Sequence, residues 1–196
     1  MTKQAVQKLV VICVGGMAGS GKSTVARKLA KRYGLKYVSG GDALRVIAVE
    51  KGYAASRRGW WEGRDGMRFL KERGRDERFD EEVDRKLLEL ARHGNVILDS
   101  WTMPWLVEDG FKIWLETSPE KRAKRIAGRD KIGYEEALNA LKQKEKYTKT
   151  IYEKLYGFCL GEDFAPFNFI LDTENMNSAE VFKVICTVID KVVFKS

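Results

Sequence analysis

The sequence predicts a single α/β domain in which helices cover both faces of a parallel sheet. Two observations carry this prediction. Short apolar runs alternate with amphipathic segments along the chain, and the first run leads into a glycine-rich stretch that opens a helix. Strands that alternate with helices in this way form parallel sheets with both faces buried. The length of 196 residues fits one such domain, so we treat residues 1–196 as one folding unit.

In the first half of the chain, the apolar run over residues 9–14 is typical of a buried parallel strand. Gly34 follows the next amphipathic segment, at the position where a helix end favours glycine. Asp42 can cap a further helix. Residues 53–78 carry little periodicity. The expected strands are 9–14, 36–38 and 95–99, and the expected helices are 22–33, 42–51 and 80–93.

In the second half, Ser118 and Pro119 supply an N-cap and a first helical position. The expected strands here are 111–115 and 168–172, and the expected helices are 119–128, 134–156 and 178–193. Two stretches, 43–93 and 128–165, interrupt the alternation of strands and helices. We expect both to form lobes above the sheet.

Composition excludes several protein classes. No apolar run approaches the ~20 residues that span a bilayer, and the N-terminus shows no cleavable apolar segment. Three scattered cysteines are too few for a disulfide framework or a zinc site. We therefore expect a cytoplasmic protein without a membrane partner.

The formal net charge is +8, and the positive charge is concentrated in three segments, 57–78, 121–131 and 142–154. A basic surface of this kind suits an anionic ligand, either phosphates or nucleic acid, although each segment could also be a solvated helix face.

The strongest motif is a glycine-rich turn that follows the first strand and opens the first helix. Residues 16–23 fit the pattern G-x-x-x-x-G-K-[ST], whose backbone N–H groups surround phosphate oxygens. Lys22 would reach the β- and γ-phosphates, and the Ser23 hydroxyl would help to hold Mg²⁺. The residues expected to bind the nucleotide are Gly16, Met17, Ala18, Gly19, Ser20, Gly21, Lys22, Ser23 and Thr24.

The motif predicts a nucleoside triphosphate but leaves open what happens to its phosphate. A small-molecule kinase, a hydrolysing switch or motor, and an enzyme acting on nucleic acid are the three classes to consider. The length leaves little room for the accessory domains of a motor, and base-recognition patterns of GTPases are absent.

Further segments carry a family resemblance. They are GGMAGSGKST, YVSGGDALR, FDEEVDRKLLELARHGNVILDS, KIWLETSPEKRAKRIAGRD, YEKLYG and FILDT, and they cover about residues 9–190. In their order and spacing the chain resembles the nucleoside monophosphate kinases, and among them the archaeal type of cytidylate kinase. The resemblance implies a P-loop kinase fold of three α/β/α layers with a five-stranded parallel sheet. It also implies an acceptor-binding lobe at about 43–93, a lid at about 128–160, and transfer of the γ-phosphate of ATP to CMP or dCMP with Mg²⁺.

The resemblance also implies roles for individual residues. Asp99 would hold Mg²⁺ together with Ser23, and the basic helix that leads to the lid carries Arg122, Arg125 and Arg129. The expected catalytic cations are Lys22, Arg125 and Arg129, and the expected acceptor-binding residues are Asp42, Arg45, Asp84, Arg85 and Trp101. Trp101 stands where the family has a phosphate-binding arginine, and the lid offers Lys144, Lys146, Lys149 and Ile151 where the family generally has arginines.

Several alternatives stay open. Trp60 and Trp61 could stack on a nucleobase beside Arg57, Arg58 or Arg64, or they could be a hydrophobic plug. The arginines of residues 122–129 could instead form a solvent-facing stripe, and Asp42 could be only a helix cap. The acceptor could also be a small-molecule hydroxyl or an RNA end rather than a nucleotide, and a nucleotide sensor without catalytic activity is a third possibility.

Overall fold

The computed structural model describes residues 9–54, 60–61 and 63–195. Its centre is a five-stranded sheet in the order β2-β3-β1-β4-β5, and every neighbouring pair is parallel. The strands are β1 (Val11–Gly16), β2 (Lys36–Ser39), β3 (Val96–Asp99), β4 (Phe111–Glu116) and β5 (Phe169–Asp172). The predicted fold class is therefore confirmed.

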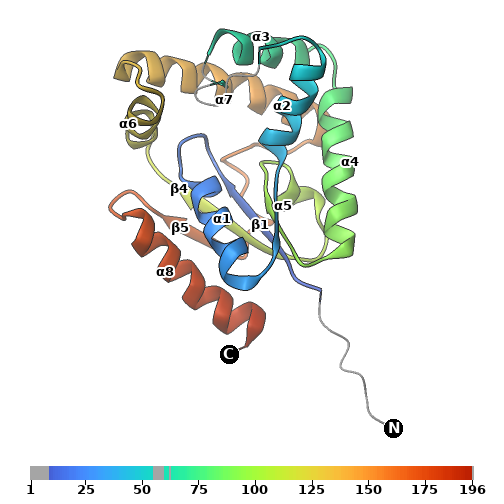
Figure 1. The fold of residues 1–196 in the computed structure, drawn as a ribbon, viewed down its shortest axis with the longest axis vertical. Helices are drawn as coiled ribbons and strands as arrows, with labels where there is room; N and C mark the ends of the chain where they lie inside the picture. The colour runs from blue at the N-terminus through green and yellow to red at the C-terminus, as the bar shows by residue number, and fades with distance from the viewer. Residues whose placement is uncertain (1–8, 55–59, 62, 196) are drawn as a thin grey trace.

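Helices cover both faces of this sheet. On one face, α1 (Lys22–Tyr33) and α8 (Ser178–Ile189) lie beside each other (Figure 1). The inward positions of β1 alternate as expected for a strand, because Ile12 and Val14 pack with α1 and α8 whereas Cys13 belongs to the core of the other face. That second core includes α4 (Arg78–His93) and the short helix α5 (Met103–Leu106).

The remaining helices lie near the carboxyl ends of the strands. They are α2 (Gly40–Glu50), α3 (Arg64–Arg73), α6 (Pro119–Asp130) and α7 (Tyr134–Tyr156). Figure 1 shows α6, α7 and α3 across the top of the molecule, above the sheet. The stretches expected as lobes thus form helices on the side of the sheet where parallel α/β proteins bind ligands.

Three local expectations were wrong. Ser39, not Asp42, is the N-cap of α2: the Ser39 hydroxyl accepts a hydrogen bond from the Asp42 N–H at 3.1 Å, so the helix starts earlier in the chain. Residues 64–73 form α3, although this stretch looked aperiodic. The last helix also ends before residue 193, because residues Asp190–Phe194 form a π-helical turn.

No helix in the part of the chain that the structure describes is both long enough and apolar enough to cross a bilayer.

Candidate functional site

A cavity of about 1220 Å³ lies at the carboxyl edge of the sheet. The turn after β1, which we call the phosphate loop (residues 16–24), forms one wall. Further lining residues come from the helices α1, α2, α3, α4, α6, α7 and α8, from β2, and from the segments before α3 and after β3 and β5. The cavity therefore joins the phosphate loop to both expected lobes in one space, and it is large enough for small-molecule ligands.

The backbone of the phosphate loop requires glycine at two positions. Gly16 has φ +145°, and a Cβ there would lie 2.5 Å from the Ser20 Oγ. Gly19 has φ +81°, and its Cβ would lie 2.8 Å from the Arg122 carbonyl oxygen. Both conformations are left-handed or crowded, so a side chain would displace the turn. The loop ends at the N-terminus of α1, whose unpaired N–H groups and partial positive charge favour an anion.

Arg125 and Arg122 extend from α6 to the phosphate loop. Arg125 is half-buried and lines the cavity, and its Nη1 donates to the Ser20 carbonyl at 3.1 Å. Arg122 is buried: its Nη1 donates to the Ala18 carbonyl at 3.1 Å and pairs with Glu145 of α7. Arg122 does not line the cavity, so it fixes the loop against the lid helix rather than facing a ligand.

Arg129 lies one helical turn beyond Arg125 and also lines the cavity. Its Nε donates to Asp130 Oδ1 at 2.7 Å, and about half of its side chain is exposed. Its guanidinium group thus carries a positive charge at the lining of the cavity.

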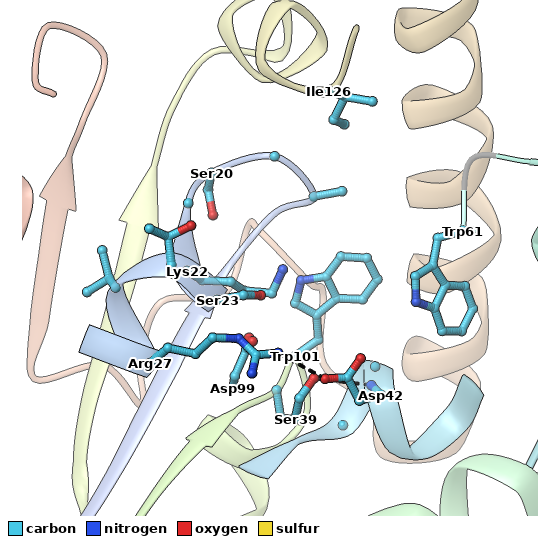
Figure 2. Close-up of a pocket in the computed structure, with 18 of the residues that line it drawn as sticks. Ser20, Lys22, Ser23, Arg27, Ser39, Asp42, Trp61, Asp99, Trp101 and Ile126 are labelled. Carbon is cyan, nitrogen blue, oxygen red and sulfur yellow. Dashed lines mark hydrogen bonds and ion pairs between the residues drawn. The ribbon is translucent and has the colours of Figure 1, made fainter. Parts of the chain in front are cut away.

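Asp99 closes β3 next to the phosphate loop and is buried. Its Oδ2 accepts a hydrogen bond from the Tyr37 hydroxyl at 2.8 Å, whereas its Oδ1 is buried without a hydrogen-bond partner. Figure 2 shows Asp99 near Lys22 and Ser23. A buried, unpartnered carboxylate oxygen beside a phosphate loop is suited to a hard cation or to its bound water.

Tyr37 and Arg27 were not identified from the sequence. The Arg27 guanidinium carbon lies 4.2 Å from the centroid of the Tyr37 ring, and Arg27 Nη2 pairs with Asp42 Oδ2 at 3.1 Å. Asp42 also lies 3.7 Å from Arg45. Asp42 and Arg45 both line the cavity, on the α2 side. Nothing in the sequence marks Tyr37 or Arg27 as a site residue, because a lone tyrosine and a charged helix residue are common in surface positions.

Asp84 lies deep in the wall that α4 contributes. Its Oδ1 accepts from the Thr102 hydroxyl and its Oδ2 from the Tyr156 hydroxyl, both at 2.7 Å. Burial raises the pKa of Asp84 to about 6, although these two hydrogen bonds lower it. The carboxyl thus ties α4 to the segment after β3 and to the end of α7. Arg85, expected beside it, is exposed on α4 and does not line the cavity.

Of the two alternatives for the tryptophan pair, Trp60 fits the hydrophobic plug, whereas Trp61 is placed where it could stack on a ligand. Trp60 is a buried plug, whose Nε1 donates to the Ala54 carbonyl at 2.6 Å, although part of it reaches the cavity wall. Trp61 is half-buried and lines the cavity. Arg64 is exposed and is not part of the lining, and Arg57 and Arg58 lie outside the described residues.

Trp101 lies between the phosphate loop and Trp61 (Figure 2). The lid lysine that reaches the cavity is Lys144, which is buried and whose Nζ lies 5.1 Å from the Trp61 ring centroid and 5.6 Å from that of Trp101. Of the other lid positions noted in the sequence, Lys149 pairs with Glu162 and Ile151 is in a core cluster. Helix α7 therefore directs Lys144 into the cavity between two aromatic rings.

Comparisons with known proteins agree with this geometry. The profile of the family described as AAA domain matches residues 12–148. The cytidylate kinase of Pyrococcus horikoshii is 34% identical over 182 residues, which cover 92% of this chain and 88% of the relative. The cytidylate kinase of Methanocaldococcus jannaschii is 31% identical over 186 residues, covering 92% and 98% of the two chains. That of Ignicoccus hospitalis is 35% identical over 180 residues, covering 90% and 97%.

Solved structures agree on the fold. Shikimate kinase from Bacteroides thetaiotaomicron superposes with a TM-score of 0.56 at 16% identity, covering 95% of this chain and 99% of that one. Deoxyadenosine kinase from M. mycoides superposes with a TM-score of 0.54 at 15% identity, covering 92% and 100%. The fold likeness and the level of identity to the archaeal enzymes lead to one conclusion: the chain belongs to the cytidylate kinase family of P-loop nucleoside monophosphate kinases.

Proposed function

We propose that this enzyme transfers the γ-phosphate of ATP to CMP or dCMP, with Mg²⁺ as the metal. The cavity supports the proposal, because it joins a phosphate loop to an acidic and basic wall on the α2 and α4 side. The relatives that match over nine-tenths of the chain are cytidylate kinases, which favours a cytidine nucleotide as the acceptor.

The phosphate loop would hold the triphosphate of ATP through its backbone N–H groups and Lys22. An oxygen of the acceptor phosphate would attack the γ-phosphorus, forming a new P–O bond while the bond to the β-phosphate oxygen breaks. ADP and a nucleoside diphosphate are the products. Little covalent help is needed, so positioning and charge neutralisation carry the reaction. Arg125 and Arg129 would neutralise the negative charge that spreads over the transferring group.

Asp99 and Ser23 would hold the Mg²⁺ ion, which neutralises phosphate charge when bound. The unpartnered Oδ1 of Asp99 supports this assignment. Tyr37 would fix the rotation of the carboxylate through its hydrogen bond to Oδ2, leaving Oδ1 directed away from the hydroxyl.

The acceptor would bind between α2, α4 and the lid. Asp42, Arg45, Asp84 and Trp61 line this side, and Lys144 would offer its charge to the acceptor phosphate. Closing of the two lobes over the substrates would exclude water, which otherwise competes for the γ-phosphate.

An acceptor panel tests the proposal. We expect ADP formation, followed in a coupled assay, with a kcat/KM for CMP or dCMP at least tenfold above that for UMP and AMP. Phosphorylation of AMP in preference to CMP would contradict the acceptor assignment. Absence of ADP formation with all four nucleotides would reject the proposed reaction, and a 5′-hydroxyl RNA assayed in parallel would then test for an RNA end as the acceptor.

A further inference from the structure

Trp101 contacts the phosphate loop at two points. Its indole Nε1–H donates to the Gly16 carbonyl at 2.6 Å, and the Lys22 Nζ lies 5.2 Å from the centroid of its ring. Gly16 is the first residue of the loop and Lys22 is its cation. One side chain, on the segment after β3, therefore contacts both ends of the turn that would hold the triphosphate.

The hydrogen bond acts at a strained junction. Gly16 has φ +145° and is the last residue of β1, where the chain leaves the sheet for the loop. A donor on its carbonyl oxygen fixes the orientation of the peptide group between the strand and the loop. Loss of the donor would leave this carbonyl, on a buried residue, without that partner and would free the loop to rotate.

The ring contact acts on the side chain of Lys22. An ammonium group within 6 Å of an indole centroid is attracted to the negative face of the ring, and the attraction grows when the site excludes water. The same ring lies 5.6 Å from the Nζ of Lys144 on the lid helix. The indole therefore offsets the repulsion between two like charges that converge on the same part of the cavity.

Trp101 also packs against two apolar clusters. It contacts the core cluster around Leu70 and Ile151, and the cluster around Ala18 and Leu141. Its position is thus fixed from the acceptor lobe, the lid and the loop, which gives the indole a defined orientation. With its N–H used by Gly16, the side chain is suited to positioning the loop rather than to hydrogen bonding with a substrate.

We propose that Trp101 is a positioning residue, which holds the phosphate loop and Lys22 in the conformation that binds the triphosphate. This inference rests on the proposed function, since it assigns Trp101 to the ATP side of the reaction. It predicts that substitutions at Trp101 weaken the binding of ATP more than the binding of the acceptor.

Two substitutions separate the two contacts. Trp101→Phe keeps a ring near Lys22 but removes the N–H donor, and Trp101→Leu removes both. By calorimetry with MgATP we expect the Kd to rise about fivefold for Trp101→Phe and about thirtyfold for Trp101→Leu, from the loss of one hydrogen bond and then of the cation–π contact. The KM for ATP is expected to rise in parallel, while the KM for CMP changes less than twofold.

Trp105→Phe is the matched control. Trp105 is also half-buried and also donates one indole hydrogen bond, to Asp163 Oδ2 at 2.8 Å, but it does not line the cavity. We expect its variant to bind MgATP as the unsubstituted chain does. Melting temperatures of all variants report any loss of folding. If Trp101→Leu does not fold, Trp101→Phe alone still tests whether the hydrogen bond to Gly16 supports the binding of MgATP.

An unchanged Kd for MgATP in Trp101→Phe, or an increase confined to the KM for CMP, would overturn the inference, since the side chain would then serve the acceptor or the packing alone. Failure of the proposed function would give a different result. The unsubstituted chain would not bind MgATP, or Lys22→Ala would bind MgATP as tightly as the unsubstituted chain does. In either case the inference on Trp101 would also be wrong.

Discussion

Arg129 and Arg125 are the two arginines of α6 that we propose to act on the transferring phosphoryl group, and both line the cavity. Arg129 pairs with the neighbouring Asp130. Arg125, by contrast, donates to the Ser20 carbonyl. Substitution of Arg129 should therefore separate catalysis from ATP binding better than substitution of Arg125.

We expect Arg129→Ala to lower kcat by about a thousandfold, as for arginines that stabilise phosphoryl transfer, with the Kd of ATP nearly unchanged. Arg129→Lys should recover part of the loss, because lysine keeps the charge without the bidentate fork. Lys124→Ala, on the same helix but exposed and outside the cavity, is the matched control. Steady-state kinetics measures all three variants. A kcat for Arg129→Ala near that of the unsubstituted enzyme would show that Arg129 takes no part in the reaction.

Asp84 makes a prediction about pH. Burial raises its pKa to about 6 from an ordinary value of 3.8, so the folded state binds this proton more tightly than the unfolded state does. The free energy of unfolding should then fall by up to about 3 kcal/mol as the pH rises from about 4 to about 6. Asp84→Asn removes this contribution. Urea unfolding of both proteins across this range should give curves that diverge with pH, and parallel curves would contradict the assignment.

At the scale of elements, a buried ion pair joins α3 to α4. Arg73 and Asp80 are each 2% exposed, and Arg73 Nε donates to Asp80 Oδ2 at 3.0 Å. The Tyr152 hydroxyl of α7 accepts from the same guanidinium at 3.4 Å. Burial lowers the pKa of Arg73, but the charges of Asp80 and Tyr152 and the hydrogen bonds to both residues together raise it by more, so the net shift is upward. The pair thus connects the acceptor lobe to the lid.

Breaking this pair from one side should be costly. Arg73→Met leaves the carboxylate of Asp80 buried without its partner, and we expect a loss of about 3–5 kcal/mol in the free energy of unfolding. The double variant Arg73→Met, Asp80→Leu should recover most of that loss, because neither buried charge remains. Denaturant unfolding tests both. A double variant as unstable as the single one would show that the pair acts through more than its charges.

The elements also show what the sequence could and could not predict. The bounds of α1 and α7 were predicted correctly, and for α1 the end followed from Gly34 after an amphipathic pattern. Helix α3 was missed because its buried positions include Gly66 and Arg73 beside Phe69 and Leu70. A stripe with a glycine and an arginine in it does not register as apolar, although its spacing is helical.

Part of the site was also predictable from the sequence, namely the part that depends on a local motif. The phosphate loop followed from the sequence because its geometry depends on glycines at fixed spacing. Arg122 was placed with Arg125 and Arg129 on one helix face, but its burial against Glu145 depends on α7, which is distant in sequence. Tyr37 reaches the cavity through the tertiary fold alone, and no local pattern marks it. Lys144 was noted from the sequence with Lys146 and Lys149, but only the fold shows that Lys144 lines the cavity.

For the whole molecule, the order of the strands explains the position of the cavity. β1 lies at the centre of the sheet, between β3 and β4. The chain passes from β1 to β2 on one side of the sheet, whereas it passes from β4 to β5 on the other side, so the direction of the connections reverses between β1 and β4. Ligands of open α/β sheets bind where the strand order reverses. The lobes that rise above this edge bring the acceptor side, the lid and the phosphate loop around a common space (Figure 1).

Transfer of the phosphate itself is the central claim, and an isotope label tests it most directly. ATP labelled in the γ-phosphate is incubated with the enzyme, Mg²⁺ and CMP, and the products are separated by chromatography. The account predicts that the label appears in CDP, and that Lys22→Ala leaves it in ATP. Label recovered as inorganic phosphate, with none in a nucleoside diphosphate, would contradict it.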